Sequence, residues 1–229
     1  MNQAQASRDQ RLGALGEFRG LYAITPDEPD TRELVHKVRQ ALAGGARMVQ
    51  YRNKSADATL RLEQSRALLA LCGTARVPLI INDDLDLALA LGADGVHLGR
   101  DDIPVAAART RLDREMLLGV SCYDRLDLAM DARNAGADYV AFGSAFASTT
   151  KPGAPQAPLS LYREAKARLT LPIVAIGGIT RENARAVIGA GADAIAVIRA
   201  LFGAHDVERS AREFASLFSV HDLEKRSAV

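Results

Sequence analysis

The stretch Gly136-Ala137-Asp138-Tyr139-Val140 decides the fold, because it recurs along the chain in nearly the same form. The other copies start at Gly44, Gly92 and Gly191, so that consecutive copies lie 44 to 55 residues apart. Each copy follows a helix-like stretch and leads into a short apolar run. This is the pattern of a helix that ends at glycine, a tight turn and a buried strand. The spacing matches two strand–helix units, so the four copies predict eight units.

Eight short apolar runs are predicted to be the strands. They are almost continuously apolar, as is typical of parallel strands that are covered on both faces. Pro78 and Pro172 begin two of them, at a position where the missing N–H of proline is tolerated. The predicted strands cover residues 21–24, 48–51, 78–81, 95–98, 117–120, 139–142, 172–175 and 194–198.

Segments with helical spacing separate these strands. In the first, Asp30 is followed by Glu33, which is the pattern of a capping box, and Leu34, Val38 and Leu42 come after it at helical spacing. The other segments follow the same plan, and the one that starts at residue 103 has the weakest pattern. The predicted helices cover residues 30–43, 58–71, 85–91, 103–109, 126–135, 159–168, 181–188 and 207–218.

The alternation of strands and helices predicts an α/β chain. Its repeat favours a single closed (β/α)8 TIM barrel over an open doubly wound sheet. No Gly-x-Gly-x-x-Gly pattern follows the first strand, which argues against a dinucleotide-binding sheet. We expect a short N-terminal tail over residues 1–19, a catalytic barrel domain over 20–220 and a C-terminal tail over 221–229.

The composition limits the partners. The chain has 229 residues, 48% of them hydrophobic and 25% charged, with a net charge of +1, so it fits one large domain without an electrostatic footprint for nucleic acid or membrane. No apolar run is long enough to cross a bilayer, and residues 1–17 lack a signal-peptide core. Cys72 and Cys122 are too few for a disulfide framework or a zinc site, so we expect a cytoplasmic location. The sequence leaves a homo-oligomer open.

Polar residues follow the second strand, at the barrel end where enzymes of this fold keep their active sites. They are Gln50-Tyr51-Arg52-Asn53-Lys54. Alternate side chains of an extended chain share a face, so Gln50, Arg52 and Lys54 are expected to point together into the barrel mouth. Two cations and an amide suit a diphosphate. The alternative is a solvated loop with ordinary surface charges.

Carboxylates follow the next two strands, at Asp83 and Asp84 and again at Asp101 and Asp102. Neighbouring strands lie about 4.8 Å apart, so carboxylates at both ends can converge on one ion. Oxygen ligands without His or Cys favour Mg²⁺, which keeps waters and bridges to phosphates. The alternative is that these aspartates cap the following helices. The neighbouring cations of the second strand favour a metal–diphosphate site.

The remaining strand ends indicate a second anion site. Ser121 follows the fifth strand with no His or Lys placed to activate it, so a polar substrate contact is expected rather than a nucleophile. Hydroxyl residues and Lys151 follow the sixth strand, in a loop typical of an anion-gripping lid or of a plain surface crossover. Gly177 and Gly178 open a helix and can offer backbone N–H groups to a phosphate, or form only a tight turn. We therefore expect two small phosphorylated substrates.

Together these motifs resemble the thiamine-phosphate synthase family, also called thiamine-phosphate pyrophosphorylases. They follow the family's order over roughly residues 20–203, and the ordered set is specific although each piece is short. The matching pieces are Gly20-Leu21-Tyr22-Ala23-Ile24-Thr25, Gln50-Tyr51-Arg52-Asn53-Lys54, Ile81-Asn82-Asp83, Gly95-Val96-His97-Leu98-Gly99, Gly119-Val120-Ser121, Thr150-Lys151-Pro152 and Ile176-Gly177-Gly178-Ile179.

The resemblance implies a transferase that joins 4-amino-2-methyl-5-hydroxymethylpyrimidine diphosphate to 4-methyl-5-(2-phosphoethyl)thiazole, giving thiamine phosphate and diphosphate. It implies one Mg²⁺ held by Asp83 and Asp102. The implied catalytic residues are Arg52, Lys54, Ser121 and Lys151. The implied contacts of the pyrimidine diphosphate are Gln50, Tyr51, Arg52, Asn53, Lys54, Asn82, Ser121 and Lys151. The implied contacts of the thiazole phosphate are Ser148, Thr149, Thr150, Gly178, Ile198 and Arg199.

Two residues depart from the family pattern. Asn53 stands where an acidic residue is usual, and we expect a small effect because it alternates away from Arg52 and Lys54. Arg199 stands where a serine is usual, which puts the binding of the thiazole phosphate in question. The alternatives are a thiazole tautomerase on the same barrel, which needs no metal–diphosphate site, and a non-catalytic sensor of phosphorylated metabolites.

Overall fold

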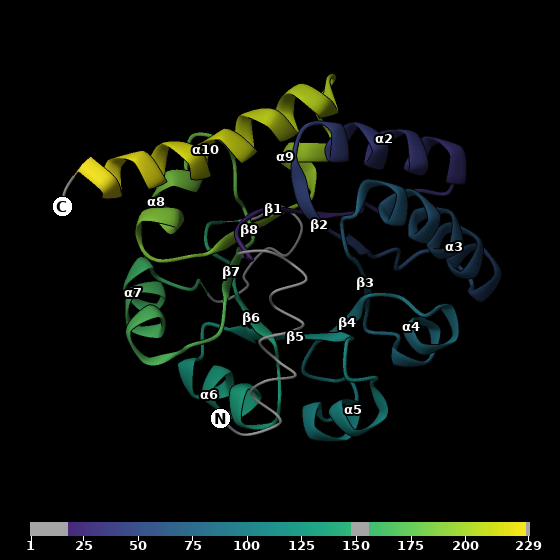
Figure 1. Cartoon of the computed structure of the whole chain (residues 1–229), viewed down its shortest axis with the longest axis horizontal. Coiled ribbons are helices and arrows are strands. Elements are labelled where there is room, and N and C mark those ends of the chain that lie inside the picture. Colours follow the sequence, from purple (N-terminus) through teal and green to yellow (C-terminus); the bar gives the residue numbers. More distant parts are fainter. Residues whose placement is uncertain (1–17, 148–155, 228–229) are drawn as a thin grey trace.

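The computed structural model describes residues 18–147 and 156–227, which form a closed barrel of parallel strands inside a ring of helices (Figure 1). Each strand pairs with the next along the chain, and β8 pairs with β1. The strands are β1 (Gly20–Ile24), β2 (Ala46–Tyr51), β3 (Leu79–Asn82), β4 (Gly95–Leu98), β5 (Leu117–Tyr123), β6 (Tyr139–Phe142), β7 (Ile173–Ile176) and β8 (Ala194–Val197). The predicted TIM barrel is confirmed.

The helices cover the outside of the barrel; α9 and α10 follow β8, and the others lie between consecutive strands. They are α2 (Thr31–Ala43), α3 (Ala58–Ala75), α4 (Leu85–Leu91), α5 (Val105–Arg111), α6 (Leu126–Asn134), α7 (Leu159–Arg168), α8 (Ala184–Gly189), α9 (Arg199–Phe202) and α10 (Val207–Ser227). The short α9 was not expected, and α10 continues well past the predicted end at Phe218. In the part of the chain that the structure describes, no helix is both long and apolar enough to span a membrane.

Two apolar layers hold the barrel together. The inner layer fills the barrel with side chains from the strands, among them Tyr22, Met48, Ile80 and Tyr139, all nearly inaccessible to solvent. The outer layer joins the other faces of the strands to the helices. Burial on both faces explains why the strands read as continuous apolar runs rather than as alternating patterns.

The repeated Gly-Ala-Asp stretch has a structural cause at the N-terminal ends of the strands. The glycine adopts a positive φ in each copy, for example 63° at Gly92 and 114° at Gly191, which turns the chain sharply from helix to strand. The aspartate then reaches to the preceding strand and accepts a backbone N–H at its start. These bonds join Asp94 to Leu79 N (2.8 Å), Asp138 to Leu118 N (2.9 Å) and Asp193 to Ile173 N (2.9 Å).

Helix starts follow local capping, with two differences from the sequence prediction. Asp30 caps α2 by accepting the N–H groups of Arg32 and Glu33, but Glu33 does not complete a capping box, because Glu28 bonds Asp30 N instead. Helix α8 begins at Ala184 rather than at residue 181. A turn precedes it, in which the Asn183 side chain bonds Thr180 N and Gly178 O.

Candidate active site

Alternation along the end of β2 sorts five consecutive residues onto two sides. Gln50 is buried inside the barrel, where its Nε2 donates to the Tyr22 hydroxyl (2.8 Å). Arg52 and Lys54 lie further along at the mouth and are held by Asp27, which accepts from Arg52 Nη1 (3.2 Å) and from the backbone N–H of Lys54 (2.8 Å). Arg52 and Lys54 thus line the cavity at the mouth, whereas Gln50 lies inside the barrel.

Tyr51 and Asn53 also line the cavity at the mouth, but their polar atoms bond within the protein. The Tyr51 hydroxyl donates to Gln64 Oε1 on α3 (2.9 Å). Asn53 is 6% exposed, and its amide donates to Glu28 O and Gln64 Oε1. Its oxygen accepts from the N–H and hydroxyl of Ser55. These bonds occupy the polar atoms of both side chains, which therefore shape the loop that carries Arg52 and Lys54.

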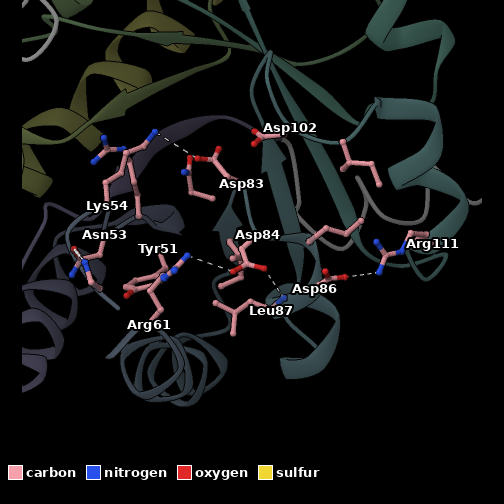
Figure 2. Close-up of a pocket in the computed structure, with 16 residues that line it drawn as sticks. Tyr51, Asn53, Lys54, Arg61, Asp83, Asp84, Asp86, Leu87, Asp102 and Arg111 are labelled. Carbon is pink, nitrogen blue, oxygen red and sulfur yellow. Dashed lines mark hydrogen bonds and ion pairs between the residues drawn. The ribbon is translucent and has the colours of Figure 1, made fainter. Parts of the chain in front are cut away.

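Asp83 and Asp102 come together at the ends of β3 and β4 (Figure 2). Lys54 Nζ lies 3.7 Å from Asp83 Oδ2. Burial raises the pKa of the Asp83 carboxyl, the neighbouring Asp102 carboxylate raises this pKa further, and Lys54 opposes both effects. The backbone of Asp83 also has a φ of 63°, a conformation that residues other than glycine rarely adopt. Such strain and like-charge proximity are typical of a site that binds a positive ligand.

Helix capping does not account for these two carboxylates. The capping role belongs to Asp84, whose Oδ1 accepts the N–H of Leu87 at the start of α4 (2.9 Å). Helix α5 has Pro104 as its N-cap and no side-chain cap, so Asp102 does not serve there. One oxygen of Asp102 accepts the N–H of Gly99 (2.6 Å). Asp83 and Asp102 are thus left to face each other at the mouth.

A cavity of about 530 Å³ opens over these strand ends. Charges of both signs line it, from the strands and from the neighbouring helices (Figure 2). Its charged residues are Arg52, Lys54, Arg61, Asp83, Asp84, Asp86, Asp102 and Arg111. Asp84 pairs with Arg61 (3.7 Å) and Asp86 with Arg111 (2.5 Å), whereas no ion pair to Asp102 is found among the described residues. Arg61 and Arg111 were not expected at the mouth, because they come from α3 and α5 rather than from strand ends.

The donor set suits Mg²⁺. Asp83 and Asp102 offer oxygen ligands, and Asn82, which the sequence analysis also named, lines the same cavity. Within the described residues there is no cluster of three or more His, Cys, Asp or Glu side chains that could hold a metal. Two carboxylates are nevertheless enough for Mg²⁺, because this ion normally keeps waters and takes further ligands from substrate phosphates.

The environment of Ser121 differs from the expectation. Strand β5 extends to Tyr123, so Ser121 lies within it, and its Oγ lies 2.9 Å from His97 Nε2 on β4. A histidine is therefore in contact with the serine, although none was expected. Burial lowers the pKa of His97 to about 4, which makes it a weak base. Its other nitrogen meets the Tyr139 hydroxyl rather than a carboxylate, so these groups do not form a Ser-His-Asp triad.

The opposite side of the mouth is built from backbone. Gly177 and Gly178 have φ values of 98° and 63°, and a Cβ on Gly178 would lie 2.5 Å from Ala147 O. Among the described residues, no acceptor is found for the backbone N–H groups of Gly178 and Ile179. Ile198 packs partly against the inner core, and the exposed Arg199 begins α9. The remaining predicted residues, Ser148, Thr149, Thr150 and Lys151, lie outside the described residues.

The fold and this mouth define a class: a (β/α)8-barrel enzyme built to bind phosphorylated ligands beyond the C-terminal ends of its strands. Residues 21–201 match the family described as thiamine monophosphate synthase. The chain belongs to this family.

Relatives of known name agree with the assignment. The chain is 55% identical over 206 residues to a thiamine-phosphate synthase of Methylobacillus flagellatus, which covers 90% of this chain and 98% of the relative. It is 53% identical over 204 residues to that of Thioalkalivibrio sulfidiphilus, which covers 89% and 97%.

Solved structures give the same result for the fold. A thiamine phosphate pyrophosphorylase from Pyrococcus furiosus superposes with a TM-score of 0.80 at 36% identity, covering 89% of this chain and 96% of that one. A 3-hexulose-6-phosphate synthase superposes with a TM-score of 0.65 over 86% of this chain and 99% of its own, but at 19% identity. The second likeness shows the fold alone.

Proposed function

We propose that this chain is a thiamine-phosphate synthase, which joins the aminopyrimidine methyl diphosphate to the thiazole phosphate and releases diphosphate. The observation that carries this function is the meeting of Lys54, Asp83 and Asp102 in one charged cavity beside Arg52. The relatives' names give thiamine phosphate as the product, and the two substrates follow from the family resemblance. The charges of the cavity suit a diphosphate leaving group.

The diphosphate is proposed to bind between the cations of β2 and the carboxylates of β3 and β4. Arg52 can grip phosphate oxygens with two N–H groups, and the half-exposed Lys54 adds a point charge. Asp83 and Asp102 would hold Mg²⁺, which neutralises charge on the leaving diphosphate when it is bound. With Mg²⁺ present, Lys54 would no longer be needed as the partner of Asp83 and could turn to the diphosphate.

The reaction needs charge neutralisation more than a base, because the thiazole nitrogen attacks with its own lone pair. Arg52, Lys54 and Lys151 are proposed to stabilise the negative charge that grows on the departing diphosphate. Gln50 and Ser121 are proposed to hold the aminopyrimidine, whose electron-rich ring stabilises the positive charge on the carbon that diphosphate leaves. The poorly basic His97 fits this assignment, because no proton has to be removed from a nucleophile.

The thiazole phosphate is proposed to bind on the opposite side of the mouth. The N–H groups of Gly178 and Ile179 are directed donors without a protein acceptor among the described residues. Arg199 can add a charged contact, and Ile198 can pack against the thiazole ring. The hydroxyls of Ser148 to Thr150 would complete this side. Two free, buried thiols, Cys72 and Cys122, fit the proposed reducing cytoplasm.

The test is a condensation assay with both substrates, in the presence of Mg²⁺ and of a chelator, with thiamine phosphate and diphosphate measured separately. We expect both products in equal amounts, and no turnover after chelation. A matched reaction without the pyrimidine diphosphate reports any isomerisation of the thiazole. Isomerisation without condensation would contradict the proposed function and favour a tautomerase.

A further inference from the structure

A continuous chain of hydrogen bonds crosses the inside of the barrel below the mouth. Gln50 Nε2 lies 2.8 Å from the Tyr22 hydroxyl, which lies 2.9 Å from the Tyr139 hydroxyl. Tyr139 lies 3.1 Å from His97 Nδ1, and His97 Nε2 lies 2.9 Å from Ser121 Oγ. The two ends of the chain are the two residues that the proposed function assigns to the aminopyrimidine. The three inner residues have no role in that proposal.

The number of hydrogens gives this chain one direction. The amide N–H of Gln50 donates to the Tyr22 oxygen, so the hydrogen of Tyr22 has only the Tyr139 oxygen left among the described residues. The hydrogen of Tyr139 is then left with His97 Nδ1. Burial makes each of these bonds matter, because leaving a hydroxyl unsatisfied inside the barrel is unfavourable. Tyr22 and Tyr139 are 1% and 0% exposed, respectively.

The direction fixes the tautomer of His97. Because Nδ1 accepts from Tyr139, the ring hydrogen must lie on Nε2, from which it is donated to Ser121 Oγ. Ser121 then accepts within the chain and keeps its own hydroxyl hydrogen for a ligand. At the other end, Gln50 uses an amide N–H within the chain and keeps its carbonyl oxygen.

The fold makes room for the central junction. His97, Gly119 and Tyr139 stand side by side in the registers of β4, β5 and β6. A Cβ on Gly119 would lie 2.1 Å from the Tyr139 ring and 2.6 Å from His97 Nδ1. Glycine between the two residues therefore lets their side chains meet across an intervening strand.

We infer that Tyr139 is a positioning residue, the central link of a directed hydrogen-bond chain that sets which atoms Gln50 and Ser121 offer to the substrate. The chain leaves an acceptor at Gln50 and a donor at Ser121. A heteroaromatic ring with an amino group at one edge and an unprotonated ring nitrogen at another matches that pair. The identity of the substrate in this inference rests on the proposed function, whereas the direction of the hydrogen bonds rests on the protein alone.

The first test measures the tautomer without substrate. Nitrogen-15 NMR of histidine-labelled protein separates protonated from unprotonated ring nitrogens, and glutamine in place of His36, His205 and His221, one at a time, identifies the His97 signals. We expect hydrogen on Nε2 in the unaltered chain and a mixture of tautomers in Tyr139→Phe. Hydrogen on Nδ1 in the unaltered chain would overturn the inference, whether or not Tyr139→Phe folds.

The second test measures steady-state kinetics of Tyr139→Phe against Tyr162→Phe. Tyr162 is an equally buried tyrosine that is not part of the hydrogen-bond chain, and its hydroxyl donates to Phe142 O (3.0 Å). We expect Tyr139→Phe to lower kcat/KM for the pyrimidine diphosphate by about tenfold, the effect of one buried hydrogen bond, with the thiazole phosphate KM unchanged. Tyr162→Phe should change neither.

Equal losses in the two variants would reduce Tyr139 to a structural residue and overturn the inference. If the unaltered protein makes no thiamine phosphate but holds His97 in the expected tautomer, only the proposed function is contradicted. The tautomer measurement therefore tests the inference, and the assay tests the proposed function, independently of each other.

Discussion

Aspartates at the two ends of the barrel look alike in the sequence but have opposite surroundings. At the N-terminal end, the buried Asp138 accepts the N–H of Leu118 and pairs with Arg109 (3.1 Å). At the C-terminal end, Asp83 and Asp102 lie close to each other, and the pKa of Asp83 is raised by burial and by that neighbour. The first arrangement stabilises the fold, whereas the second costs stability unless a cation binds. The barrel thus separates folding from binding by which end a carboxylate occupies.

The largest effect is expected when a carboxylate at the C-terminal end of the barrel is removed. Asp83→Ala and Asp102→Ala should each lower kcat/KM by on the order of 10²-fold or more, since a catalytic ion contributes several kcal/mol. Their Tm should change little, because each variant removes a like-charge neighbour together with a favourable contact, that of Asp83 with Lys54 or of Asp102 with Gly99 N–H. Asp86→Ala is the control, because Asp86 lines the same cavity but pairs with Arg111. Activity close to that of the unaltered chain in either variant at limiting Mg²⁺ would remove the metal assignment.

The next largest effect is expected when Asp138, at the N-terminal end of the barrel, is removed. Asp138→Ala should lower the free energy of unfolding by about 3 kcal/mol, because Leu118 N–H loses its acceptor inside the protein and Arg109 loses a carboxylate. The kcat of the folded fraction should not change. Urea unfolding measures the first quantity, and Asp127→Ala, which removes an exposed ion pair with Arg125, should cost far less than Asp138→Ala. Equal costs in the two variants would contradict the comparison.

The sequence predicted the barrel because the Gly-Ala-Asp stretch records a local requirement, a sharp turn and an acceptor for one backbone N–H. Alternation along an extended segment is also local, and it indicated Arg52 and Lys54 at the mouth but not the burial of Gln50 inside the barrel. Tyr51 and Asn53, which the sequence also indicated, line the same cavity and bond to Gln64 on α3.

What the sequence analysis missed depends on distant parts of the chain. The contact of Ser121 with His97 requires the register between β4 and β5, and the meeting of His97 with Tyr139 requires that register to continue to β6. Arg61 and Arg111 line the cavity from α3 and α5, which pack beside the strand ends only in the folded barrel. No short-range pattern contains these relations.

A third prediction concerns the side of the mouth that is built from backbone, where a substitution of glycine adds a Cβ instead of removing a side chain. Gly178→Ala would place a Cβ 2.5 Å from Ala147 O at a φ of 63°. We expect the thiazole phosphate KM to rise about tenfold, with a lower Tm, because the loop must shift. Gly189→Ala, where nothing lies within 4 Å of the added Cβ, should leave both unchanged. An unaltered KM in Gly178→Ala would separate this glycine from phosphate binding.

The smallest effect concerns Arg199, the departure from the family pattern. The thiazole phosphate is remote from the forming C–N bond, so a contact with it should be equally strong in the ground and transition states. Arg199→Ser should therefore raise the thiazole phosphate KM several-fold, by about 1 kcal/mol, and leave kcat within about twofold. Steady-state kinetics with saturating pyrimidine diphosphate measures both. A fall in KM would mean that the arginine obstructs the pocket.

Calorimetric titration of inorganic diphosphate, with and without Mg²⁺, measures the proposed metal–diphosphate site without turnover and without the thiazole phosphate. We expect Mg²⁺ to tighten diphosphate binding to the unaltered chain by at least about tenfold. In the double variant Asp83→Ala/Asp102→Ala this gain should fall below about twofold, while binding without Mg²⁺ stays as strong or stronger. The same Mg²⁺ gain in the folded double variant would contradict a metal–diphosphate site at the ends of β3 and β4.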